Sequence, residues 1–87
     1  RLAFRRVLFR SVVALPNQDI LVEFDSTAGQ RYTMQYSVDG KNWFNVVPAI
    51  VAGTNRTQWI DNGPPKTPSH PSTVKSRLYR VVEQSID

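Results

Sequence analysis

Apolar and polar residues alternate along several short segments of this chain, and this alternation limits the possible folds more than any other pattern in it. The clearest case runs from residue 32 to residue 38. One face carries Tyr32, Met34, Tyr36 and Val38, and the other carries Thr33, Gln35 and Ser37. Because successive side chains of a strand point to opposite faces of its sheet, this spacing predicts a strand with one buried face. In the same way, Ile20, Val22 and Phe24 predict an inward-facing strand over residues 20–25.

Turn residues separate these segments at short intervals. Asp39-Gly40 is a strong hairpin signal, because glycine accepts a positive φ. Residues 62–76 hold four prolines and are expected to form a loop. The other predicted strands lie within residues 12–15, 43–47, 49–52, 56–61 and 77–83. This pattern predicts an all-β fold, a small antiparallel β-sandwich of the immunoglobulin or fibronectin-III type with six or seven strands.

Length and composition place this pattern in one small domain. The chain has 87 residues and no cysteine, which excludes disulfides and thiolate metal sites. No apolar run approaches the roughly 20 residues that a membrane-spanning helix needs, so we expect no membrane insertion. A sandwich of this size needs most of its large apolar side chains inside. We therefore predict that the core contains Tyr32, Trp43, Trp59 and Tyr79.

The positive charge of the chain is concentrated at its beginning. The formal net charge is +4, and Arg1, Arg5, Arg6 and Arg10 account for all of it. Residues 4–11, Phe-Arg-Arg-Val-Leu-Phe-Arg-Ser, match the translation of a widely used sequencing adapter at every position. We interpret residues 1–11 as a non-native, adapter-derived segment and leave them out of the predicted fold. We expect residues 12–87 to be a single module from a longer protein.

Few side chains in the sequence are candidates for catalysis or metal binding, and each of them has a structural interpretation. His70 is the only histidine and lies in the proline-rich segment, which favours a solvated or loop-packing role over a base or metal ligand. Asp39 is expected to shape the hairpin, and Asp61 and Asn62 to bond the backbone of their own turn. We therefore predict no enzyme activity, no catalytic residue, no metal site and no cofactor. Tyr36 and Phe44 are the aromatic residues that we expect to be exposed, and they are the candidate ligand-binding residues.

Several short motifs resemble a sandwich module that is often the C-terminal module of large secreted bacterial proteins. The motifs are Ala28-Gly-Gln-Arg-Tyr32, Tyr36-Ser-Val-Asp39 with Trp43, Trp59-Ile-Asp61 and Arg77-Leu-Tyr-Arg-Val81. Leu78 stands where that module usually has Phe. The resemblance covers roughly residues 18–83 and implies a non-catalytic accessory or structural module, located outside the cell or on its surface.

Two alternatives remain beside this interpretation. The aromatic residues favour a carbohydrate-binding module that uses Tyr36 and Phe44. The basic segment at the start favours nucleic-acid or membrane-surface binding, with an affinity that depends on salt. The adapter match argues against this second alternative, and we expect no nucleic-acid partner. The expected partners are an unidentified protein or polysaccharide and other domains of the parent chain.

Overall fold

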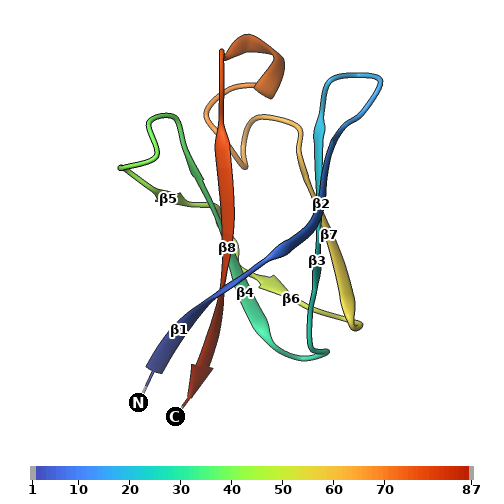
Figure 1. The fold of residues 1–87 in the computed structure, drawn as a ribbon, viewed down its shortest axis with the longest axis vertical. Helices are drawn as coiled ribbons and strands as arrows, with labels where there is room; N and C mark the ends of the chain where they lie inside the picture. The colour runs from blue at the N-terminus through green and yellow to red at the C-terminus, as the bar shows by residue number, and fades with distance from the viewer. Residues whose placement is uncertain (1, 87) are drawn as a thin grey trace.

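The chain folds into two antiparallel sheets that face each other (Figure 1). The structure is a computed structural model that describes residues 2–86, with side chains from residue 3 to residue 84. Its eight strands are β1 (Leu2–Val7), β2 (Phe9–Ala14), β3 (Ile20–Asp25), β4 (Arg31–Ser37), β5 (Phe44–Asn45), β6 (Ile50–Val51), β7 (Arg56–Asp61) and β8 (Leu78–Ile86). A single 3-10 turn, η1 (Pro71–Thr73), interrupts the long loop before β8.

The larger sheet has five strands and the smaller sheet has three. The five-stranded sheet has the order β1-β8-β4-β5, with β6 also paired to β4, and the three-stranded sheet has the order β2-β3-β7. All strand pairs are antiparallel. The predicted fold class, a small antiparallel β-sandwich, is therefore confirmed. The seven predicted strand segments each overlap one observed strand, and β1 is the additional one.

Residues 2–14 contribute a strand to each sheet, although we left residues 1–11 out of the predicted fold. β1 pairs with β8 from Leu2 opposite Ile86 to Val7 opposite Val81, so both ends of the chain lie side by side (Figure 1). At Leu8 the chain crosses to the other sheet, where β2 pairs with β3. β1 thus covers an edge of β8 that would otherwise leave backbone groups unpaired, and Val7 and Phe9 pack against the core. The adapter origin of residues 4–11 is a separate matter and stays a prediction.

The core lies between the two sheets and is built from the predicted inward faces. Val22 and Phe24 of β3 and Val81 of β8 are fully buried, and Tyr32 and Met34 of β4 nearly so. The rings of Phe24 and Tyr32 lie 5.3 Å apart at a tilt of 57°. Such tilted pairs stabilise a core beyond the area that they bury.

The inward face of β4 ends sooner than its sequence pattern predicts. We expected Val38 on the same face as Tyr32, but its side chain is 60% exposed. β4 ends at Ser37, and the alternation of faces ends with it. Ser37 is buried instead, because its Oγ accepts the backbone N–H groups of Asp39 and Gly40.

The hairpin turn after β4 forms where the sequence predicts it. Gly40 has a φ of +76°. One carboxylate oxygen of Asp39 accepts the backbone N–H groups of Lys41 and Asn42, both at 2.8 Å. These bonds, together with those from the side chains of Asn42 and Ser37, hold the pKa of Asp39 well below its usual range. The predicted role of Asp39 in shaping the hairpin is thus confirmed.

Candidate functional site

The two predicted ligand-binding residues lie together at the end of the five-stranded sheet. Tyr36 of β4 and Phe44 of β5 are directly opposite in the strand register. Their ring centroids are 5.6 Å apart, and the rings are inclined by 32°. Phe44 is 52% exposed, whereas Tyr36 is half-buried and packs against the core. The guanidinium of Arg77 also lies 5.8 Å from the centre of the Tyr36 ring. Phe44 is therefore the more accessible ring of this pair.

Trp43 does not belong to the core, contrary to the prediction. Its side chain is half-buried, and the guanidinium carbon of Arg80 lies 4.1 Å from the centre of its ring. Tyr32 and Trp59 are buried as predicted, and Tyr79 is half-buried with its ring 5.7 Å from that of Trp59. Trp43 differs because it precedes the short strand β5 at the sheet edge. At that edge its ring stacks against the guanidinium of Arg80 and does not pack into the core.

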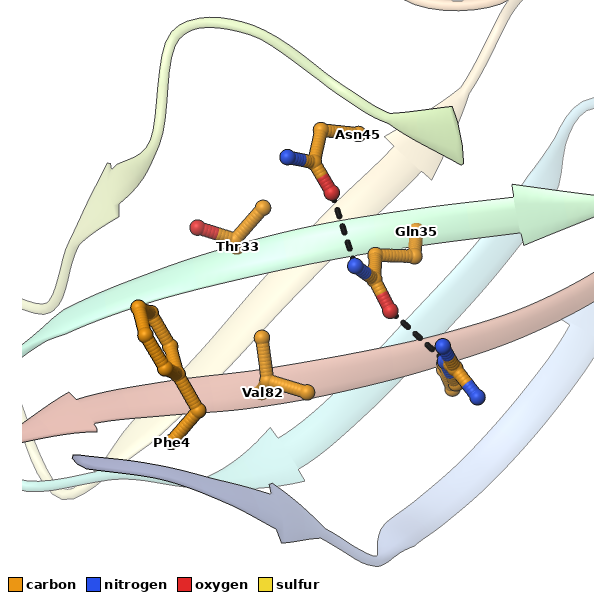
Figure 2. A pocket seen from close by; sticks show the side chains of 6 residues that line it. Phe4, Thr33, Gln35, Asn45 and Val82 are labelled. Carbon is orange, nitrogen blue, oxygen red and sulfur yellow. Dashed lines mark hydrogen bonds between the residues drawn. The ribbon is translucent and has the colours of Figure 1, made fainter. Parts of the chain in front are cut away.

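Polar side chains form a connected row on the outer face of the five-stranded sheet. The Nε of Arg80 donates to Oε1 of Gln35 at 2.6 Å, and Nε2 of Gln35 donates to Oδ1 of Asn45 at 2.7 Å. Figure 2 shows these two bonds crossing from β8 over β4 to β5. We call Arg80, Gln35 and Asn45 the amide row. Its residues stand at facing positions on neighbouring strands, which is why they meet.

A shallow depression of about 370 Å³ lies over the amide row. Thr33 of β4 and Val82 of β8 continue it along the sheet, and Phe4 of β1 closes one end (Figure 2). This surface was not among the sites predicted from the sequence. A signal was present, because Gln35 and Thr33 occupy the polar face of β4, but the strand that brings Arg80 opposite Gln35 is 45 residues away.

The polar residues buried most deeply form a second cluster, centred on Asp61 at the end of β7. Both carboxylate oxygens of Asp61 are occupied. Oδ1 accepts the Gly63 N–H at 3.0 Å and the Thr67 hydroxyl at 2.5 Å. Oδ2 accepts from Arg77 at 3.0 Å and from the Tyr79 hydroxyl at 2.5 Å. The bond to Gly63 confirms the predicted turn role of Asp61, and the other three bonds extend it.

These contacts shift two pKa values away from neutrality. Burial by itself raises the pKa of Asp61, but hydrogen bonds from Thr67, Tyr79, the Gly63 N–H and Arg77 together outweigh burial and leave it lowered. Burial and the hydrogen bond to Asp61 raise the pKa of Tyr79 above its ordinary value of 10.0. Asp61 thus stays ionised and Tyr79 stays neutral across the range where proton transfer at neutral pH takes place.

His70 connects the long loop to the turn between β2 and β3. Its Nε2 lies 2.7 Å from Oδ1 of Asp19, and its Nδ1 lies 2.7 Å from the Ser72 hydroxyl. Both ring nitrogens are therefore engaged, and the predicted loop-packing role of His70 is confirmed. Among the residues with described side chains, no three His, Cys, Asp or Glu residues lie close enough together to hold a metal ion. Residues 2–86 likewise contain no helix that is long and apolar enough to cross a membrane.

Comparisons with known proteins give no relative for this chain. No family model matches it, and neither a curated protein nor a solved structure is significantly similar to it. The fold and the two polar clusters are therefore the basis for any statement about function.

Proposed function

We propose that this chain is a non-catalytic accessory module of an extracellular bacterial protein, which serves as an interaction or spacer domain. The observation that carries this proposal is the Asp61 cluster. It is the most buried group of ionisable side chains described, and all four protein donors to Asp61 belong to the loop and strands that Asp61 holds together.

The pKa shifts in that cluster support a structural role. A general acid or base works best when its pKa lies near the working pH. The pKa of Asp61 is lowered and that of Tyr79 is raised, so both move away from this range. Asp61 is also fully buried, which keeps it out of reach of a substrate.

Turnover assays on the full chain test this proposal. We expect cooperative unfolding in urea together with no release of reducing ends or of carboxylic acid from panels of polysaccharides and ester substrates. Turnover that is lost in His70→Ala, with the fold retained, would overturn the proposal. His70 is the variant to use because its imidazole is half-buried and reaches the surface, unlike Asp61.

Carbohydrate binding through Tyr36 and Phe44 is the second candidate function. The specific observation is that Phe44 presents a half-exposed ring beside the ring of Tyr36. If a neutral glycan stacks there, Phe44→Ala should weaken binding on a glycan array, whereas Val47→Ala should not. Val47 is 73% exposed on the same segment and is a matched control. Equal binding by both variants would exclude this site.

A further inference from the structure

The hydrogen bonds of the amide row have a fixed direction, and Arg80 sets it. A guanidinium has donors and no acceptor, so Arg80 can bond only to the carbonyl oxygen of Gln35. This leaves the NH2 group of Gln35 facing Asn45, which must therefore present its own carbonyl oxygen. The NH2 group of Asn45 consequently turns away from the row (Figure 2). The row thus ends in a donor at the surface.

Unused hydrogen-bonding groups on this surface are mainly donors. Among the residues with described side chains, the two terminal nitrogens of Arg80 and the amide nitrogen of Asn45 make no hydrogen bond, and neither does the Thr33 hydroxyl beside them. Asn45 is exposed, and Arg80 and Thr33 are half-buried, so solvent or a ligand reaches all three. A molecule rich in acceptor oxygens would satisfy them.

The positive charge of this face favours an anionic molecule among those rich in acceptor oxygens. Arg31 and Arg80 occupy outward positions of the five-stranded sheet, opposite Gln84 and Gln35 respectively. Arg6 of β1 is exposed on the same face, opposite the outward-facing Val82. None of the outward-facing residues described on this sheet is Asp or Glu, whereas Glu23 and Asp25 face outward on the other sheet. Arg31 and Arg80 stand four residues apart along the strand direction, or roughly 13 Å at a rise of about 3.3 Å per residue. Neutral side chains, Thr33 and Val82 among them, occupy the space between them.

From this arrangement we infer that the outer face of the five-stranded sheet binds an anionic polysaccharide of the polyuronate class, extended along β4 and β8. Its carboxylates would accept charge-assisted hydrogen bonds from Arg31 and Arg80. Its hydroxyl and ring oxygens would accept hydrogen bonds from Asn45 and Thr33. This inference rests on the proposed function, since it gives the non-catalytic module a ligand. It places that ligand on the face opposite to the core, away from Tyr36.

The same geometry argues against a nucleic acid on this face. A nucleic-acid strand carries a phosphate about every 3.4 Å, and proteins that bind it line their surface with closely spaced cations. Here three guanidinium groups, those of Arg6, Arg31 and Arg80, stand on three different strands, with neutral side chains between them. Nonspecific single-strand binding also stacks successive bases on several exposed rings. Among the described residues of this face, Phe4 is the one exposed ring, and Arg80 lies over the ring of Trp43.

Binding of the full chain to polygalacturonate, measured by affinity electrophoresis and by calorimetry, tests the inference. Arg80→Gln and Asn45→Ala should each weaken binding about tenfold, which is the usual cost of losing one hydrogen bond to a ligand. Arg56→Gln is the matched control, because Arg56 is an exposed arginine on the outer face of the three-stranded sheet. Asn45→Ala should also leave the fold intact, because Asn45 lies exposed on a two-residue edge strand. A loss of binding in this variant is therefore not a consequence of unfolding.

Binding that is lost in Arg80→Gln and Asn45→Ala, kept in Arg56→Gln and absent for neutral dextran supports the inference. Three results would overturn it: no binding to polygalacturonate, an equal loss in Arg56→Gln, or tighter binding to a single-stranded oligonucleotide at the same ionic strength. Reducing ends are measured in the same samples. Absence of binding without cleavage rejects only this inference, whereas cleavage of the polymer rejects the proposed function.

Discussion

Arg77 and Asp61 form an ion pair that is closed off from solvent. The Nη1 of Arg77 lies 3.0 Å from Oδ2 of Asp61, and the two side chains are 3% and 0% exposed. Arg77 also donates to the backbone oxygen and the hydroxyl of Ser69, at 2.8 Å each. One side chain therefore joins the end of β7, the start of β8 and the loop between them.

Removal of Arg77 should destabilise the domain strongly. Arg77→Ala leaves the carboxylate of Asp61 buried without its cation, which typically costs about 3–5 kcal/mol. Arg10→Ala is the control, because Arg10 and Asp25 pair at 3.3 Å with side chains 48% and 65% exposed. Its cost should stay below about 1 kcal/mol. Urea denaturation measures both free energies of unfolding, and similar values for the two variants would contradict the importance of the buried pair.

The free energy of unfolding should fall at both ends of the pH scale. Because the folded pKa of Asp61 lies below its ordinary value of 3.8, its contribution is present above that value and is lost as pH falls through the folded pKa. The folded pKa of Tyr79 lies above 10.0, so its contribution is complete below pH 10 and is lost as pH rises toward the folded pKa.

Tyr79→Phe isolates the alkaline part of this dependence. The variant should unfold more easily at pH 7 by about 1–3 kcal/mol, because Asp61 loses a buried donor. Above pH 10 its stability should fall less steeply than that of the natural chain, since the phenol that titrates is gone. Urea denaturation at several pH values measures this difference, and parallel curves above pH 10 would rule out Tyr79 as the group responsible.

Two glycines with similar backbone angles should respond differently to alanine. Gly40 and Gly63 have φ values of +76° and +85°, which cost an L-residue about 1–2 kcal/mol. A Cβ at Gly40 would lie 3.5 Å from a methyl group of Leu78, an ordinary contact. A Cβ at Gly63 would lie 3.0 Å from the backbone nitrogen and Cα of His70. Thermal unfolding should therefore show a larger loss for Gly63→Ala, and an equal loss would contradict the close approach of the loop.

Deletion of residues 1–7 should weaken the domain without unfolding it. The buried core comes from the later strands, and β1 adds only Val7 to it, a loss of about 2 kcal/mol. The deletion also exposes the edge of β8, and exposed edges promote association between chains. We expect cooperative unfolding in urea and a concentration-dependent sedimentation coefficient. A shortened chain without a cooperative transition would show that β1 is essential.

Sequence reasoning succeeded wherever a feature is local. The strand β4 and its buried Tyr32 and Met34 follow from the spacing of neighbouring residues, as does the Asp39 turn. It failed for Trp43, because ring size predicts burial but not whether the ring lies at a sheet edge beside Arg80. It also missed the partners of Asp61, since Arg77 and Tyr79 follow it by 16 and 18 residues.

The class of the fold follows from local sequence, because a period of two and well-placed turn residues act over a few neighbouring positions. Strand order and register, and with them the choice of which polar side chains meet, depend on the packing of the whole domain. The amide row exists because the register sets Arg80 opposite Gln35 and Gln35 opposite Asn45. Such pairing depends on how whole sheets pack, and a one-residue shift in register would separate these side chains.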